Sequence, residues 1–302
     1  MRRASSIEFL AIGDWGRFGS HDQLAVSRAM HHVAMSRPVD FVLSLGDNFY
    51  EDGVVGLDDP HWWASFEEPY YWGGLRVPWY AVLGNHDYRG NPDAQIAYTA
   101  HSDRWNMPAR YYRSSWPGPV NPLLDVFCLD TTTLIQRYWP GGTETIPGVV
   151  WPDPYRQLAW LEEGLHCSGA RWKIVAGHHA IASASPIHGS SSELDDRLRP
   201  LLAEYGAPLY LSGHDHDLQH LGLPGGLNCV VSGAGSEVRT TGSNAHTLFS
   251  ESALGFVHVQ VTMADIRIAF YDIDATLLHS ANVTSPMHRV LRRRRSVAHD
   301  AA

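Results

Sequence analysis

The sequence predicts an α/β protein in which two mixed β-sheets pack together and are flanked by helices. In its first half, short apolar strands alternate with helical stretches, a pattern typical of parallel βαβ units. From residue 228 on, short alternating runs such as residues 255–261 follow one another, which favours antiparallel strands. The 302 residues contain no internal repeat and no linker-like stretch, so one large two-sheet domain is expected.

The individual elements follow from the apolar pattern and from the residues that interrupt it. Residues 8–12 predict a buried strand that ends at Gly13, and residues 22–35 predict a helix that stops before Pro38. Further strands are expected at residues 41–45, 79–83, 123–129, 173–176 and 208–211, with a helix over residues 155–165. This order places a strand immediately before each of several short polar turns.

We predict a single domain over residues 1–290, followed by a basic tail over residues 291–302. The run Arg292–Arg295 is expected to be solvated or disordered, and contact with an anionic surface is the alternative. Residues 131–153 form a Thr-, Gly- and Pro-rich stretch. A loop of that length is more often functional than neutral.

An aromatic-rich stretch spans residues 60–80 and includes Trp62, Phe66 and Trp79. Such rings stack on a base or a sugar in some binding sites. Packing of a helix onto the sheet is the favoured interpretation, because large aromatic side chains mostly serve cores.

Composition excludes several classes of protein. Hydrophobic residues make up 44% and charged residues 18%, which predicts a packed core. The net charge of −9 argues against nucleic acid as a partner. The sequence has no run of about 18 apolar residues that would span a membrane.

The first residues and the cysteines bear on the compartment. Residues 1–6 run directly into the first strand, so a cytoplasmic protein is expected, or a secreted or periplasmic one if a leader was removed. The three cysteines lack the close spacing of a disulfide framework or a zinc knuckle. Cys128 lies in an apolar run and is expected to be a buried small hydrophobic residue.

Five short segments each pair a glycine with Asp, Asn or His, and each follows an apolar stretch. They are Ile12–Gly16, Leu45–Tyr50, Leu83–Asp87, Val175–His178 and Ser212–His216. Each predicts a strand followed by a tight turn that presents a metal-type ligand. Together they are typical of a two-metal site.

The residue types divide into two metal positions. Two cations about 4 Å apart repel each other and need a bridging anion, and Asp47 follows the most apolar strand and is the best candidate. Asn85, His178 and His214 are neutral ligands that suit a divalent ion such as Fe(II), Zn(II) or Mn(II).

The other position takes Asp14, Asp47, His216 and Tyr50. A phenol with a pKa near 10 ionises readily only on a strongly Lewis-acidic ion, which favours Fe(III). An iron–phenolate pair absorbs visible light by charge transfer.

These segments resemble the motif set of the metallophosphoesterases. Asp14-Trp15-Gly16 replaces the Asp-x-His of many members, and Tyr50 stands three residues after the Asp of the second motif. This combination is similar to the purple acid phosphatases, above all the small tartrate-resistant type, over about residues 7–272. Further matches lie in residues 77–80, 157–161 and 211–219.

The resemblance implies a calcineurin-like four-layer α/β/β/α sandwich with the metals at the carboxyl ends of the strands. It places Asp14, Tyr50 and His216 on Fe(III), Asp47 between the ions, and Asn85, His178 and His214 on the second, divalent metal. The residue chemistry gave the same division.

The implied reaction is acid hydrolysis of small phosphate monoesters. A hydroxide held by the metals would attack phosphorus in line, and both metals would neutralise the developing charge. His86 is the predicted proton donor. His188 resembles a family histidine that touches substrate, with a plain loop histidine as the alternative, and we expect Asn85, His86 and His188 to contact the substrate.

Three neighbours of the predicted ligands each have two alternative roles. His179 adjoins His178 and is expected to face the opposite way, as adjacent strand residues do, although it could support the site indirectly. Asp215 and Asp217 either orient the neighbouring imidazoles or are surface turn residues.

Three other functions compete with the phosphomonoesterase. A phosphodiesterase or nucleotide pyrophosphatase could use the same scaffold, and redox-active iron could carry out peroxide chemistry. A binding protein with a degenerate site is disfavoured, because every predicted ligand position holds a competent residue. Neither nucleic acid nor a membrane is expected as a partner, and a monomer is favoured.

Overall fold

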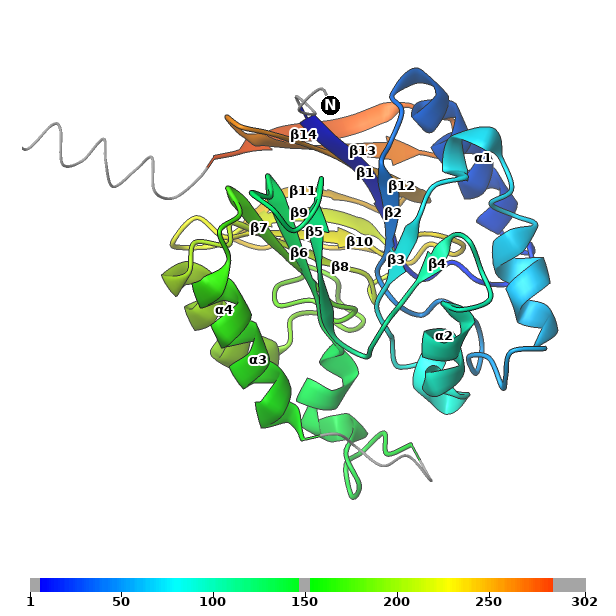
Figure 1. The fold of residues 1–302 in the computed structure, drawn as a ribbon, viewed down its shortest axis with the longest axis horizontal. Helices are drawn as coiled ribbons and strands as arrows, with labels where there is room; N and C mark the ends of the chain where they lie inside the picture. Colours follow the sequence, from blue (N-terminus) through cyan, green and yellow to red (C-terminus); the bar gives the residue numbers. More distant parts are fainter. Residues whose placement is uncertain (1–5, 147–152, 285–302) are drawn as a thin grey trace, which may run out of the picture.

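The computed structural model describes residues 6–146 and 153–284, and these residues form four layers. Two seven-stranded sheets face each other, and helices cover the outer face of each (Figure 1). The predicted α/β/β/α sandwich of two mixed sheets is therefore confirmed.

The first sheet has the order β14-β13-β12-β1-β2-β3-β4. Its parallel strands are β1 (Ser6–Ile12), β2 (Phe41–Ser44), β3 (Trp79–Ala81) and β4 (Trp105–Asn106). Its antiparallel strands are β12 (Gly255–Thr262), β13 (Ile266–Asp272) and β14 (Leu277–Val283). The early strands are parallel and the late ones antiparallel, as the sequence pattern predicts.

The second sheet has the order β11-β9-β10-β8-β7-β6-β5. Its parallel strands are β6 (Leu124–Cys128), β7 (Trp172–Ala176), β8 (Leu209–Ser212) and β10 (Asn228–Ser232). The antiparallel strands are β5 (Tyr112–Trp116), β9 (Leu218–Gly222) and β11 (Thr247–Glu251). The parallel strands are central in this sheet, whereas those of the first sheet extend to its edge at β4. The expectation of antiparallel strands from residue 228 on is wrong for β10, which pairs with β8 in parallel.

Helices lie on both outer faces. Helix α1 (Gln23–Ser36) packs on β12 and β13, whereas α3 (Pro154–Cys167) and α4 (Ser192–Glu204) lie beside each other over the second sheet (Figure 1). Asp153 accepts a hydrogen bond from the Tyr155 amide, and Ser191 accepts one from the Leu194 amide. These bonds satisfy donors that the first turns of α3 and α4 leave free.

Shorter helical pieces occupy the connections. They are α2 (Pro92–Tyr98), a π-helical turn at Trp62–Glu67 and 3₁₀ turns at Gly73–Leu75, Asp87–Arg89, Thr131–Leu134 and Gln136–Tyr138. The last two belong to the stretch 131–153 that the sequence singles out as a functional loop. Residues 147–152 of that stretch lie outside the described residues.

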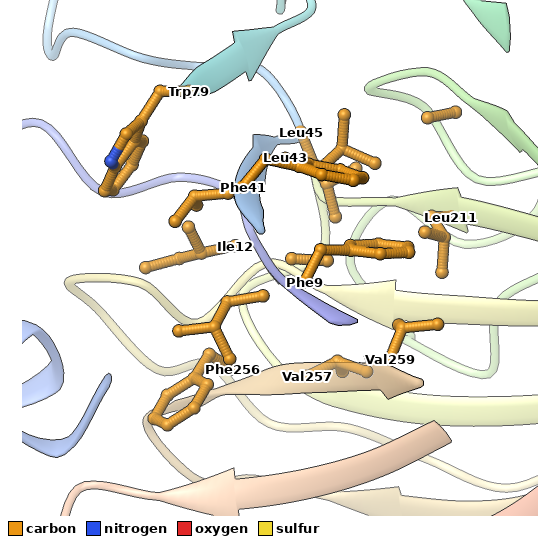
Figure 2. Packing of buried hydrophobic residues seen from close by; sticks show 14 of the residues in the cluster. Phe9, Ile12, Phe41, Leu43, Leu45, Trp79, Leu211, Phe256, Val257 and Val259 are labelled. Carbon is orange, nitrogen blue, oxygen red and sulfur yellow. The ribbon is translucent and has the colours of Figure 1, made fainter. Parts of the chain in front are cut away.

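The main core fills the space between the sheets. Phe9 of β1 stacks on Phe41 of β2 with ring centroids 4.6 Å apart, and Leu211 of β8 belongs to the same buried cluster (Figure 2). A second buried cluster lies under α3 and α4 and includes Leu161 and Leu198. Burial on both faces explains why the parallel strands read as continuous apolar runs.

The aromatic stretch mainly serves the core, as predicted. Phe66, Tyr70 and Trp79 are buried around Trp15, whose Nε1 donates a hydrogen bond to Ser44 Oγ at 2.7 Å. Because Trp15 directly follows Asp14, this packing fixes the turn at the end of β1. The same stretch also exposes rings, at Trp63, Tyr71 and Trp72.

Two further predictions can be compared with the described residues. Cys128 is fully buried, as expected, and Cys167 and Cys229 are also free thiols. Within the described ranges, no helix is long and apolar enough to cross a membrane. The tail 291–302 lies outside those ranges, so the domain boundary stays a prediction.

Candidate metal centre

The predicted ligands converge where parallel strands of both sheets end. Asp14, Asp47 and Asn85 follow β1, β2 and β3, and His178 and His214 follow β7 and β8. Tyr50 and His216 lie a few residues further along the turns after β2 and β8. The carboxyl ends of parallel strands share one edge of a sheet, so this placement follows from the topology.

All seven predicted ligands are buried: Asp14, Asp47, Tyr50, Asn85, His178, His214 and His216. Three of them, Asp14, Asp47 and His214, have left-handed backbones with φ of 62°, 47° and 69°. Non-glycine residues adopt this conformation at a cost, and such strain concentrates at functional sites. The turns therefore aim these side chains inward against local backbone preference.

Glycines leave room for the two carboxylates. A Cβ at Gly84 would collide with the carboxylate of Asp47, and one at Gly213 would collide with that of Asp14. The backbone also supports both carboxylates: the His86 amide donates to Asp47 Oδ1 at 2.8 Å, and the His214 amide donates to Asp14 Oδ2 at 2.9 Å. This explains the glycine in two of the five segments, Leu83–Asp87 and Ser212–His216.

One group of donor atoms surrounds the Tyr50 hydroxyl. Its oxygen lies 2.8 Å from Asp14 Oδ1, 3.0 Å from Asp47 Oδ2 and 3.1 Å from His216 Nε2. These are the four residues that the sequence assigns to the Fe(III) position, and the fold brings their ligand atoms together.

A second group adjoins the first. His214 Nδ1 lies 3.2 Å from His178 Nε2, which in turn lies 3.3 Å from Asp47 Oδ2. His178 Nδ1 contacts the Leu45 carbonyl oxygen at 2.9 Å, so Nε2 of this ring is the nitrogen left for a metal. Asp47 is the residue common to both groups, as a bridging ligand must be.

The electrostatics of Tyr50 and His214 fit bound cations, whereas, despite its burial, the carboxylates of Asp47 and Asp14 raise the pKa of His178 to about 9. Burial, reinforced by the charges of Asp14 and Asp47, raises the pKa of Tyr50 well above its usual value, so only a strong Lewis acid would ionise it. Burial also holds the pKa of His214 well below its usual value, as do the nearby His179 and His178, which keeps the imidazole neutral. A neutral imidazole is the form that binds metal.

The side-chain oxygen of Asn85 is a further donor that fits a cation. Its Oδ1 is buried and has no hydrogen-bond partner among the described residues. A buried acceptor without a partner costs free energy, and a cation beside it would remove that cost. The donor set therefore fits a two-metal centre with Asp47 between the ions.

The two predicted catalytic histidines lie at the rim of this centre. His86 Nδ1 contacts the Glu51 carbonyl oxygen at 2.6 Å, and its Nε2 lies 3.9 Å from Asp47 Oδ2. The ring of His188 lies 4.1 Å from that of His214, and its Nε2 contacts Arg239 Nη1 at 3.2 Å. Both positions allow contact with a molecule bound at the centre.

The prediction that His179 faces away from His178 is wrong. The two rings lie 4.8 Å apart, and a ligand nitrogen of His179 lies within 4.8 Å of those of His178 and His214. Both residues follow the end of β7, where the alternation of a strand no longer applies. His179 Nδ1 contacts Thr131 Oγ1 at 3.0 Å and its Nε2 contacts Tyr138 Oη at 3.0 Å.

Asp215 and Asp217 match neither expectation. Both are buried, so they are not surface turn residues. Asp215 accepts hydrogen bonds from Ser183 Oγ and from the His188 amide, and Asp217 accepts from Gln219. They stabilise the loops around the centre rather than the orientation of an imidazole.

Sequence reasoning missed two arginines. The Arg17 guanidinium lies 3.9 Å from the centroid of the Tyr50 ring and pairs with Glu51 at 2.6 Å and Glu237 at 2.8 Å. Arg137 Nη2 lies 3.2 Å from His214 Nε2. Arg17 directly follows Gly16 of the first segment, which is a usable signal. Arg137 lies in the stretch 131–153, whose length signals function for the segment but does not single out this residue.

Comparisons with known proteins agree with this geometry. The family model of the calcineurin-like phosphoesterases matches residues 7–218. Purple acid phosphatase 4 of Arabidopsis thaliana is 38% identical over 286 residues, covering 91% of this chain and 82% of that protein. Tartrate-resistant acid phosphatase type 5 of Mus musculus is 35% identical over 300 residues, covering 92% of this chain and 90% of that protein.

Solved structures share the fold. The Plasmodium protein GAP50, described as the anchor in the inner membrane complex, has a TM-score of 0.80 and 25% identity, and the match covers 93% of this chain and 89% of that one. A purple acid phosphatase from yellow lupin has a TM-score of 0.69 at 15% identity, with 93% and 54% of the two chains covered.

Fold and site together define a metallophosphoesterase with two adjacent metal positions. Within that class, the identity to plant and mammalian relatives over nearly the whole length shows that the chain belongs to the purple acid phosphatases. Members of this family are phosphoric monoester hydrolases with a dinuclear metal centre. The predicted family, fold and enzyme class are thereby confirmed, and the comparisons give no support to a diesterase or to peroxide chemistry.

Proposed function

We propose that this chain hydrolyses small phosphate monoesters with one Fe(III), held by Asp14, Tyr50, His216 and Asp47, and one divalent ion, held by Asp47, Asn85, His178 and His214. The observation that carries the proposal is the convergence of Asp14, Asp47 and His216 on the Tyr50 hydroxyl within 3.1 Å. A phenol placed between two carboxylates ionises only on a strongly Lewis-acidic ion, and Fe(III) is such an ion.

The chain's own residues divide the remaining tasks. When bound, the two ions supply Lewis-acid activation of water and neutralise charge on the phosphoryl oxygens. Asn85 and His188 contact the substrate. His86 donates a proton to the departing alkoxide: its Nδ1 faces the Glu51 carbonyl, so its Nε2 is the nitrogen available to the substrate.

A visible absorption spectrum combined with elemental analysis tests the metal assignment. We expect a band near about 500–560 nm, the region of phenolate-to-Fe(III) charge transfer, and two metals per chain including one iron. A colourless protein that contains two zinc or manganese ions and hydrolyses monoesters would contradict the Fe(III) assignment while leaving the phosphatase in place. The identity of the divalent ion is read from the same analysis.

Replacing His86 with alanine tests the proton donor. We expect His86→Ala to lower kcat by about 10²-fold for an alkyl phosphate, whose leaving group needs a proton, and far less for an activated aryl phosphate. The measurement is kcat for a series of monoesters with increasing leaving-group pKa. His32→Ala, an exposed histidine on α1, is the control, and equal losses across the series would argue against proton donation.

The compartment and the oligomeric state are predicted from the sequence alone. The cytoplasmic location and the monomer are predictions, and fractionation of the source cells and light scattering of the purified protein test them.

A further inference from the structure

Arg137 lies on a short, well-anchored turn at the edge of the centre. It belongs to the 3₁₀ turn Gln136–Tyr138, and the Gln136 amide donates to Glu193 Oε1 at 2.9 Å. Tyr138 is buried, and its hydroxyl contacts His179 Nε2 at 3.0 Å and accepts from Arg137 Nη2 at 2.9 Å. A long cationic side chain is thus held in place beside the candidate ligands.

Two hollows reach those ligands, and Arg137 lines the smaller of them. One has a volume of about 190 Å³ and is lined by Arg137, His188 and His214 among others. The other has a volume of about 570 Å³ and is lined by Asn85, Arg89 and Tyr138 among others. A phosphate ester bound between Asn85 and His188 would therefore have Arg137 close to its phosphoryl group.

The contact between Arg137 and His214 requires one tautomer of the histidine. A guanidinium can only donate, so His214 Nε2, at 3.2 Å from Arg137 Nη2, must be the acceptor and Nδ1 must carry the proton. Nδ1 is also the nitrogen that faces His178, at 3.2 Å, on the side of the predicted metal position.

A cation held by His214 would need the lone pair of Nδ1, so the ring proton would then sit on Nε2. Nε2 would no longer accept a hydrogen bond from Arg137, and the guanidinium could donate to another acceptor. The guanidinium also contacts the Tyr138 hydroxyl, lies 4.9 Å from the centroid of the Tyr138 ring, and has its Nε 3.7 Å from Glu144 Oε1.

We propose that Arg137 is a phosphate-recognition residue, whose guanidinium binds the phosphoryl oxygens of a substrate held at the centre. The planar fork of N–H donors matches two oxygens of a phosphoryl group, and its charge complements the dianion. This inference rests on the proposed divalent position at His214 and adds a substrate contact to it.

The experiment compares Arg137→Gln, Arg137→Lys and a charge-matched control. Arg113→Gln is the control, because Arg113 lies on the edge strand β5 and pairs with Asp125 at 3.8 Å. For each loaded enzyme, kcat and KM are measured with a phosphate monoester, together with the inhibition constant of inorganic phosphate. Zinc binding to each metal-free protein is measured by calorimetry.

Loss of one charge-assisted contact predicts about a tenfold rise in both KM and the phosphate inhibition constant for Arg137→Gln. We expect kcat to change by less than about threefold, Arg137→Lys to recover part of the affinity, and Arg113→Gln to match the wild type. Zinc should bind the metal-free Arg137→Gln protein at least as tightly as it binds the metal-free wild type, because a positive charge beside His214 has been removed.

Two results would overturn the proposal. One is an unchanged inhibition constant for phosphate in Arg137→Gln. The other is loss of zinc binding in that variant, which would make Arg137 a support for the ligands. A wild-type protein that fails to hydrolyse monoesters would instead contradict the proposed function, so the two failures are distinguishable.

Discussion

Replacing Asp47 with asparagine is expected to lower kcat by a factor on the order of 10³ or more and to leave at most one metal ion per chain. Asp47 Oδ2 lies 3.0 Å from the Tyr50 hydroxyl and 3.3 Å from His178 Nε2, so one carboxylate contacts both donor groups. Two adjacent cations repel each other strongly, and this negative charge offsets the repulsion. The asparagine amide keeps the size of the side chain but not its charge.

The measurements are kcat with a phosphate monoester and the metal content of the purified variant. Asp125→Asn is a matched control, because Asp125 is also buried but accepts its hydrogen bonds from Ser115 Oγ and Ser168 Oγ, both at 2.6 Å. We expect this control to keep both metals and normal turnover. An Asp47→Asn protein that retains two metals and activity would exclude the bridging role.

The ligand positions could be predicted because each depends on local sequence. Asp14, Asp47 and Asn85 each follow an apolar run and a glycine, and the carboxyl ends of parallel strands must share an edge. The glycine has a physical role that pattern reasoning alone does not give. Gly84 and Gly213 leave the space that the carboxylates of Asp47 and Asp14 occupy.

The features that sequence reasoning missed depend on contacts between distant segments. His179 turns toward the centre because Thr131 and Tyr138, 48 and 41 residues earlier, supply partners for both of its ring nitrogens. Arg137 reaches His214 from a stretch without regular periodicity. Neither contact leaves a trace in spacing or composition.

The aromatic stretch at residues 60–80 also depends on tertiary contacts that its sequence pattern does not predict. Packing against the core was predicted for the whole stretch, yet Trp62 is buried while its neighbour Trp63 is 64% exposed. Composition indicates that aromatic residues serve a core, but the π-helical turn Trp62–Glu67 decides which ring points inward. Only the tertiary structure specifies that turn.

Replacing Tyr50 with phenylalanine is expected to abolish the visible absorption band while the protein remains folded. The substitution removes one oxygen, which lies within 3.1 Å of Asp14, Asp47 and His216, and keeps the ring beside the Arg17 guanidinium. Without a phenolate there is no donor orbital for charge transfer to Fe(III). The measurements are the visible spectrum, the iron content and the far-ultraviolet circular dichroism of the variant.

Tyr138→Phe is the matched control, because Tyr138 is also a buried tyrosine beside the centre. Its hydroxyl contacts His179 and Arg137, whereas the candidate Fe(III) ligands surround Tyr50. We therefore expect Tyr138→Phe to keep the band. If the band instead survives in Tyr50→Phe and disappears in Tyr138→Phe, the iron lies at the histidine-rich side of the centre, and the division of ligands proposed for the two metals must be reversed.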